Sequence, residues 1–285
     1  MRKVAYKKSI FSYRMLFTIG KQFLIALGVL SLFLDIIVIV WPDSFQYGWR
    51  GFLLIILLIF ALAVFRAFPR RCLSVKFFYP DTAITLKVGN IFDQKGHLIL
   101  GFSDTFDTDI GNIICGESIQ GQFLAQVYNN DRKRLDNDLE RALSSDPFSI
   151  DNTKTKGKNR RYKIGTVAVL PGEKRKFFCC AYSKMGVDLK AYSDINNLWD
   201  SLINLWVKIR IEGEQKNIFI PVIGTNLARV PGISHSLPIK LLVFSFIVNS
   251  RVEPISKELI IMIGEKDLEK VDLLEIGDFI KSFNK

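Results

Sequence analysis

Histidine is scarce in this sequence, and histidine-based catalytic motifs are missing with it. The 285 residues include only two histidines, His97 and His235, which are far apart and form no HExxH pair. The GxSxG, GxxxxGK[ST] and GxGxxG patterns are also absent. These absences exclude the corresponding zinc proteases, α/β-hydrolases, P-loop proteins and dinucleotide-binding folds. We therefore predict no catalytic residue, no metal site and no cofactor.

Cysteine is also rare, and its spacing excludes the common paired motifs. The four cysteines, Cys72, Cys115, Cys179 and Cys180, contain no CxxC pair. Adjacent cysteines such as Cys179 and Cys180 rarely form a disulfide with each other. We expect free thiols, which fits a protein domain in a reducing cytosol.

Charge is nearly missing from two stretches close to the N-terminus. Asp35 is the only charged residue between positions 22 and 40, and residues 51–65 have none. A membrane-spanning helix needs about 20 predominantly apolar residues. We therefore predict two transmembrane helices, at about residues 22–41 and 49–68. The alternative, two buried helices of a soluble protein, is less well supported because neither stretch shows a polar stripe.

The distribution of basic residues predicts how this hairpin is oriented. Residues 1–71 contain ten basic and two acidic residues, a net charge of +8, whereas residues 72–285 contain twenty-nine and twenty-six, a net +3. The basic residues flank the two stretches, and the loop between them has one acid and no base. The positive-inside rule then places the N-terminus and the C-terminal domain in the cytoplasm, with the hairpin in the membrane.

The same distribution bears on partners. Most of the excess positive charge lies where it would meet anionic lipid headgroups, so we predict contact with the lipid bilayer and no nucleic-acid binding. Asp35 is a candidate for a function inside the membrane, since an acid there is costly unless it is used. The alternative is that Asp35 lies near enough to the interface to stay hydrated.

Residues 72–285 alternate between strand-like and helical patterns. This alternation predicts an α/β sheet with helices on both faces. A clear helical pattern follows Ser193, which can cap a helix that ends near Gly213. Strand-like runs occur at residues 73–79, 83–88, 98–102, 162–170, 176–182, 217–223 and 258–263.

Two connections after predicted strands have the composition of a ligand site. Residues 96–109 lead from a strand into a loop with three aspartates, and residues 223–232 contain two glycines, a Thr-Asn pair and Arg229. Ligands of α/β sheets bind at the carboxyl ends of the strands. The second connection could form a phosphate-binding nest of backbone amides; the alternative is a structural turn. The basic segment 151–163 is predicted to be a solvated hairpin or excursion.

Four segments together resemble a known family. Gly89-Asn-Ile-Phe92, GHLILGFSDTFDT, SIQGQF and PVIGTNLARV are similar to a divergent macrodomain, and more closely to the macro domain of the membrane-anchored effectors of Thoeris anti-phage systems. The likeness covers about residues 72–285. It implies a macrodomain-like, three-layer α/β/α mixed sheet, preceded by the two-helix transmembrane hairpin of residues 1–71.

The resemblance also implies the ligand-binding positions. Asn90 stands where macrodomains commonly have an acid against the adenine amino group, and Asn226 where the diphosphate loop usually has glycine. Asp104 and Asp107 would face ribose hydroxyls or a group attached beyond them. The full implied set is Asn90, Ile91, Phe102, Asp104, Thr105, Asp107, Ser118, Gln120, Gly121, Gly224, Thr225, Asn226, Leu227, Ala228 and Arg229.

The family resemblance implies a signal sensor rather than an enzyme. The expected ligand is an ADP-ribose derivative, histidine-ADP-ribose, made by a partner TIR-domain enzyme. Binding is expected to change a homo-oligomer so that its hairpins disrupt the membrane and abort the infection. One alternative is a membrane-tethered ADP-ribosyl hydrolase that uses Asp104 or Asp107 to activate water, and another is a membrane scaffold without a ligand.

Overall fold

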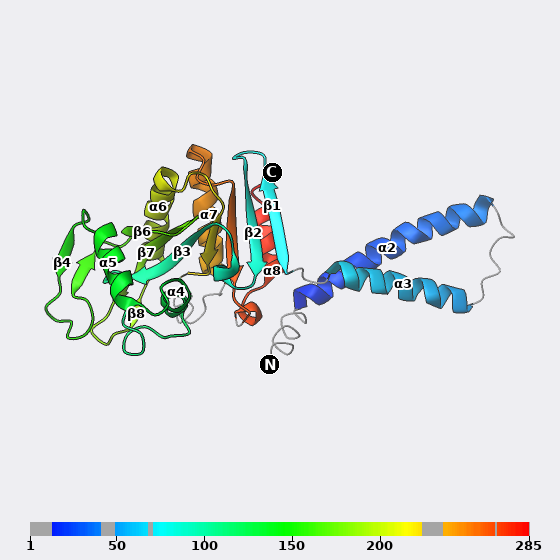
Figure 1. Ribbon diagram of the computed structural model, residues 1–285. Coiled ribbons are helices and arrows are strands. Elements are labelled where there is room, and N and C mark those ends of the chain that lie inside the picture. Colours follow the sequence, from blue (N-terminus) through cyan, green and yellow to red (C-terminus); the bar gives the residue numbers. More distant parts are fainter. Residues whose placement is uncertain (1–12, 41–48, 68–70, 224–235, 266, 285) are drawn as a thin grey trace. The chain divides into compact units, whose positions relative to one another are not determined.

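The computed structural model describes residues 13–40, 49–67, 71–223, 236–265 and 267–284. The chain divides into two compact units, Met1–Arg70 and Arg71–Lys285 (Figure 1). The first consists of helices and the second of a sheet with helices around it. Each is described by itself below.

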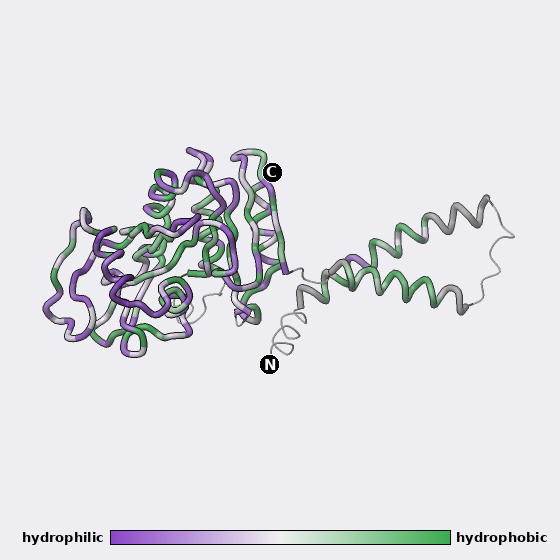
Figure 2. The backbone as a smooth tube through the Cα atoms, in the orientation of Figure 1, coloured by the Kyte–Doolittle hydropathy of each residue, from purple (hydrophilic) through white to green (hydrophobic). Residues whose placement is uncertain are grey.

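The first unit contains the two predicted helices, α2 (Tyr13–Val40) and α3 (Trp49–Ala67). They pack against each other through an edge-to-face pair, with 5.9 Å between the ring centroids of Phe23 and Phe60. Most of their described residues are hydrophobic (Figure 2). Many of these side chains are exposed. Within the described residues, no helix has both the length and the apolar character needed to cross a membrane.

The second unit is built on one mixed sheet with strand order β1-β2-β10-β9-β3-β7-β6, and β8 pairs with the end of β7. Strands β2, β10, β9, β3 and β7 are parallel, while β1 and β6 run antiparallel at the two edges. The strands are β1 (Cys72–Phe77), β2 (Thr82–Val88), β3 (His97–Ser103), β6 (Val167–Pro171), β7 (Lys176–Met185), β8 (Ala191–Tyr192), β9 (Ile218–Pro221) and β10 (Glu258–Ile263).

Helices cover both faces of this sheet because alternate strand residues are apolar on both sides. On one face, Leu98, Leu100 and Phe102 of β3 lie in a core cluster with Phe123 and Leu139. These two come from α4 (Ile119–Val127) and α5 (Arg132–Ala142). The other layer consists of α6 (Ile195–Glu212), α7 (Ser236–Val252) and α8 (Leu273–Lys281) (Figure 1). Two short 3-10 helices complete the connections, η2 (Ile91–Asp93) and η4 (Leu268–Lys270).

Two local predictions need correction. The predicted strand over residues 162–170 is divided in two, because Gly165 adopts a φ of 90° and its amide donates to the Ala181 carbonyl at 2.8 Å. Helix α6 is capped by Asp194, which accepts from the Asn197 amide at 2.7 Å. The predicted cap, Ser193, instead donates to the Tyr182 carbonyl.

The basic segment after α5 forms a small hairpin, which is one of the two alternatives predicted for residues 151–163. Strands β4 (Phe148–Ile150) and β5 (Arg160–Tyr162) pair antiparallel in a separate two-stranded sheet. The hairpin is not wholly solvated, because Lys154 in its loop is buried. The amide of Tyr162 donates to the Asp104 carbonyl at 2.9 Å and joins the hairpin to the end of β3.

Candidate functional site

The carboxyl ends of the parallel strands form the edge at which a ligand site was predicted. Gly89 and Asn90 follow β2, and the connection from Asp104 to the start of α4 follows β3. The Gly89 amide donates to the Ile263 carbonyl at 3.1 Å, which ties the ends of β2 and β10 together. We call this the carboxyl edge. The connection after β9 falls at residues 224–235, so the predicted contacts of Gly224, Thr225, Asn226, Leu227, Ala228 and Arg229 lie outside the described residues.

Asn90 lies at this edge, but its side chain already has a structural partner. Its carbonyl oxygen accepts from the Phe92 amide at 3.1 Å and caps η2. The family resemblance implied that this oxygen would instead accept a hydrogen bond from an adenine amino group. The side chain is exposed, so a second acceptor contact is geometrically open.

Ile91 and Phe102 require a correction. Both were predicted to contact the ligand, yet each is only 2% exposed and belongs to the core cluster. Phe102 stacks on Phe106, with 5.6 Å between ring centroids. Neither residue has free surface on which a ligand could lie. Both instead pack in the core next to the carboxyl edge.

Asp104 and Asp107 follow β3 and are both buried in internal ion pairs. The Asp104 carboxylate accepts from Arg161 Nη1 at 2.7 Å and from the Met185 amide at 2.8 Å. The Asp107 carboxylate accepts from Lys154 Nζ at 2.7 Å. The predicted role of facing a ligand must therefore be corrected: these carboxylates fix the β4–β5 hairpin to the end of β3.

The neighbouring hydroxyls complete the Asp107 environment. Thr105 Oγ1 donates to Asp107 Oδ2 at 2.5 Å, and the Lys158 amide donates to Asp107 Oδ1 at 2.7 Å. Thr105 is itself 1% exposed. The Lys154 ammonium makes a second bond, to the Lys158 carbonyl at 2.7 Å. Donors and acceptors are thus matched within the cluster, as buried charges require.

Arg161 connects two carboxylates. Burial alone would lower the pKa of Arg161, but hydrogen bonds to Asp104 and Asp151 outweigh it and raise that pKa. The pKa of Asp151 is lowered to about 2 by hydrogen bonds from Thr153 and from Arg161. Arg161 and Asp151 therefore keep their charges at neutral pH, so the contact between them is a full ion pair.

The start of α4 is the second predicted contact region. Ser118 accepts from the Gly121 amide at 3.1 Å and caps the helix. A Cβ atom at Gly121 would lie 2.4 Å from the Gly116 carbonyl oxygen, so the glycine lets the preceding turn pack closely. Gln120 differs from both: its amide nitrogen Nε2 is buried and has no hydrogen-bond partner among the described residues.

Sequence reasoning missed the cations that neutralise the aspartates. Lys154 and Arg161 were assigned to a solvated segment, whereas the Lys154 side chain is 0% exposed and pairs with Asp107. A signal was present, because an acid-rich stretch of residues 104–109 and a base-rich stretch of residues 154–163 occur in one domain. Their pairing could have been suspected, although the partners could not have been assigned from spacing.

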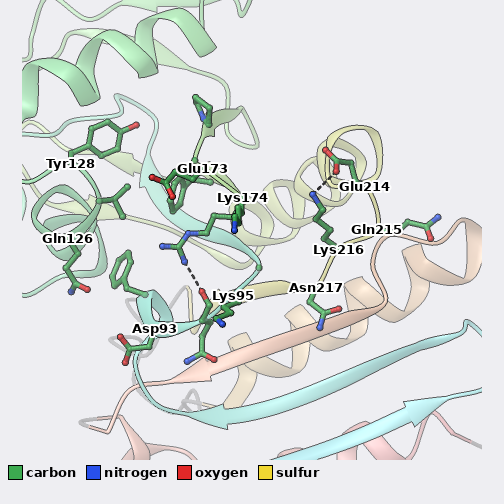
Figure 3. Close-up of a pocket in the computed structure, with 18 of the residues that line it drawn as sticks. Asp93, Lys95, Gln126, Tyr128, Glu173, Lys174, Glu214, Gln215, Lys216 and Asn217 are labelled. Atoms are coloured by element: carbon green, nitrogen blue, oxygen red, sulfur yellow. Dashed lines mark hydrogen bonds and ion pairs between the residues drawn. The ribbon is translucent and has the colours of Figure 1, made fainter.

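Two hollows of the described surface lie at opposite edges of the sheet. One of about 710 Å³ at the carboxyl edge is lined by Asp104, Arg161, Met185 and residues of the β4–β5 hairpin. The other, of about 1040 Å³, lies at the opposite edge of the sheet, where the strands begin (Figure 3). Across the described part of the chain, no cluster of three His, Cys, Asp or Glu side chains is placed to hold a metal ion.

Comparisons with known proteins found a matching family and a relative. The family described as "Thoeris protein ThsA, Macro domain" matches residues 84–264. The Thoeris protein ThsA of Bacillus amyloliquefaciens is 25% identical over 215 residues, which cover 70% of this chain and 68% of that protein.

Solved structures agree on the fold. The Oceanobacillus iheyensis macrodomain with ADP has a TM-score of 0.51 at 12% identity, covering 75% of this chain and 100% of that one. A mutant of the same macrodomain has a TM-score of 0.50 at 13% identity, covering 75% of this chain and 96% of that one. The predicted macrodomain-like mixed α/β sheet is therefore confirmed.

Proposed function

The chain belongs to the family of the Thoeris protein ThsA macro domain, and from this premise we propose that it is a sensor–effector of anti-phage defence. In this proposal the α/β unit binds an ADP-ribose-derived signal at the carboxyl edge, without turning it over. The helical hairpin then carries the response to the lipid bilayer.

The unpaired amide of Gln120 is the observation that carries the binding proposal. A buried donor without an acceptor costs about 1–3 kcal/mol, so such a group is rarely left unused. Gln120 lies in the first turn of α4, where the free backbone amides favour an anion. Gln120 as a whole is only half-buried, so a change of its side-chain rotamer would bring this donor to a diphosphate or ribose oxygen at the helix terminus.

The identity of the ligand is proposed from the family. The related macrodomain noted above was solved with ADP, which shares the diphosphate and adenosine of ADP-ribose. Histidine-ADP-ribose, supplied by a partner TIR-domain enzyme, is our specific proposal for the signal. The exposed side chain of Asn90 is available for the adenine end.

The membrane step is proposed from the first unit. On α2 and α3, exposed apolar side chains include Leu24, Leu32, Leu54, Leu57 and Phe65, which are 65%, 65%, 68%, 68% and 80% exposed. Water is an unfavourable solvent for such a surface, and a bilayer or neighbouring hairpins would cover it. We propose a homo-oligomer in the inner membrane, with the N-terminus and the α/β unit cytoplasmic. The side chain of Asp35 lies outside the described residues, and its membrane role stays a prediction.

The point at which the chain enters the α/β unit supports coupling between the two steps. The Val88 amide donates to the Arg71 carbonyl at 2.9 Å, directly before Gly89 and Asn90. The Arg71 side chain also reaches Glu265 after β10, with 3.6 Å between Nη1 and Oε1. Arg71, the first residue of the α/β unit, is thus fixed at the edge that would bind the signal, and a ligand that moves the ends of β2 and β10 would move Arg71.

Calorimetric titration of the full-length protein in detergent tests the proposal. ADP-ribose, histidine-ADP-ribose and cyclic ADP-ribose isomers would each be titrated into the wild type, Gln120→Leu and Gln126→Leu. We expect one ligand to bind the wild type and to bind Gln120→Leu at least tenfold more weakly, since the donor is lost. Gln126→Leu, on the exposed side of the same helix, should bind like the wild type. Equal affinity in all three proteins would refute the proposed contact, and no binding at all would refute the sensor.

The hydrolase alternative is less well supported by the geometry. Both oxygens of Asp104 and of Asp107 already accept hydrogen bonds from internal donors. A proton taken from water by either carboxylate would weaken an internal ion pair, so these groups are poorly placed to act as a general base. Incubation of the full-length protein with ADP-ribosylated substrates should release no product, and multiple turnovers would favour the enzyme instead.

A further inference from the structure

The large hollow at the amino ends of the strands, which we call the amino-edge cleft, is unused by the proposed function. It contains the residue that directly precedes each of four parallel strands: Gly96 before β3, Arg175 before β7, Asn217 before β9 and Lys257 before β10. Its volume of about 1040 Å³ is at the upper end of the range for small-molecule sites. Connections far apart in the sequence therefore converge on one cleft (Figure 3).

Charge in this cleft is strongly unbalanced. Its lining contains six basic residues and three acidic residues, a net charge of +3. Residues 72–285 as a whole also have a net charge of +3. The net charge of residues 72–285 thus equals that of this one cleft, so the charges of the other residues in this range balance. The basic residues are Lys95, Arg134, Lys174, Arg175, Lys216 and Lys257.

Within the described residues, five of the six cations have no carboxylate partner. Only Lys216 is paired, with 2.8 Å between its Nζ and Oε2 of Glu214. The ammonium groups of Lys95, Lys174 and Lys257 have no acceptor within bonding distance among the residues the structure describes. This contrasts with the carboxyl edge, where the buried cations are paired.

The two arginines are held in place without losing their charge. The Arg175 guanidinium lies 5.2 Å from the centroid of the Phe177 ring, and its Nη1 donates to the Gln94 carbonyl at 2.8 Å. The Arg134 guanidinium lies 5.6 Å from the centroid of the Tyr128 ring. Aromatic faces orient a guanidinium but do not neutralise it. Both therefore present positive charge towards the cleft from fixed positions.

We propose that the amino-edge cleft is a second anion site, separate from the carboxyl edge, for a ligand that carries two or more phosphate groups. Unpaired like charges around one concavity repel one another and raise the local concentration of anions. A ligand with several phosphates matches that field, whereas a single carboxylate would leave most of the cations unpaired. The phosphates could belong to a soluble polyphosphate compound or to the headgroups of anionic lipids, and the recognition chemistry is the same.

Titration of inorganic pyrophosphate and tripolyphosphate into the full-length protein in nonionic detergent tests this site. The cleft variant is Lys95→Gln/Lys174→Gln/Lys257→Gln. The matched control, Lys76→Gln/Lys133→Gln/Lys156→Gln, removes three exposed lysines outside the cleft. We expect tripolyphosphate to bind the wild type and the control equally, and the cleft variant at least tenfold more weakly. Binding should also weaken as salt is raised from 50 to 300 mM.

A second arm distinguishes the two sources of phosphate. Phosphatidylglycerol added to the micelles should displace tripolyphosphate if lipid headgroups occupy the cleft, whereas phosphatidylcholine should not. Absence of displacement by either lipid assigns the site to a soluble compound. Equal losses in the cleft variant and the control, or no loss in either, would overturn the proposal. The cleft variant should still bind the ADP-ribose-derived ligand, so failure of this site and failure of the carboxyl-edge site give different results.

Discussion

The two edges of the sheet differ in the burial and pairing of their lysines. At the carboxyl edge, Lys154 is fully buried and its ammonium pairs with Asp107 at 2.7 Å. At the amino edge, Lys95, Lys174 and Lys257 are exposed and unpaired among the described residues. The same residue type therefore serves structure on one edge and is left available for a partner on the other.

This difference separates two uses of charge. A buried pair must be satisfied internally, because an uncompensated charge in the interior is very costly. An exposed cation is well hydrated and contributes little to stability, so it can be kept for binding. Variants of the paired and unpaired lysines should consequently act on different properties, stability at one edge and affinity at the other.

The largest effect is expected when the buried pair is broken from the acidic side. Asp107→Leu leaves the Lys154 ammonium buried with only the Lys158 carbonyl as an acceptor. We expect a loss of about 3–5 kcal/mol in the free energy of unfolding, measured by guanidinium denaturation of the full-length protein.

Two further variants show whether the cost comes from the orphaned charge. Asp107→Leu/Lys154→Met removes both charges and should recover at least half of the loss. Asp278→Leu breaks an exposed pair with Lys281, at 3.7 Å, and should cost less than about 1 kcal/mol. A double variant no more stable than the single one would show that packing of the loop, and not the unpaired charge, causes the loss.

The sequence predicted the sheet better than the site, for a physical reason. Residues 259–263 are apolar on both faces, and this local pattern is enough to predict a buried parallel strand. The division at Gly165 depended on a backbone turn, and the apolar residues on both sides of this glycine favoured one strand in the prediction. Local patterns thus predicted which segments form strands, whereas the ends of those strands depended on tertiary contacts.

The site residues illustrate the limit more sharply. Asp104 and Asp107 follow β3, as the pattern predicted, but their partners lie about fifty residues later in the β4–β5 hairpin. Pairing over that separation leaves no periodic signal in the sequence. Gln120 was included only through a family resemblance, and its distinguishing feature, a buried amide without an acceptor, exists only in three dimensions.

A smaller effect is expected from His97, which lies at the start of β3 near the amino edge. Its Nδ1 accepts from the Lys176 amide at 2.9 Å, so the proton is on Nε2, which lies 3.0 Å from the Gly213 carbonyl oxygen. Burial lowers the pKa of His97 below 6.5. Because the unfolded chain then binds the proton more readily, this residue lowers stability only as pH falls below about 6.5.

The expected slope is at most about 1.4 kcal/mol per pH unit. His97→Gln retains an acceptor and a donor but does not titrate, so it serves as the reference. The difference in unfolding free energy between the wild type and this variant should be constant from pH 7 to 8 and should shift against the wild type from pH 6.5 to 5. A constant difference over the whole range would show that His97 keeps its ordinary pKa when folded.

The smallest effect on stability is expected at the unpaired lysines, and it sharpens the comparison most directly. Lys257→Met removes an exposed cation from the amino-edge cleft, where neighbouring lysines have the same charge. Because repulsion is relieved and no ion pair is lost, the free energy of unfolding should stay within about 0.5 kcal/mol of the wild type. The same substitution at Lys154 should cost several times more, since it leaves the buried Asp107 carboxylate without its cation. Guanidinium denaturation of the two variants side by side measures this contrast, and equal losses would mean that the two edges do not use their lysines differently.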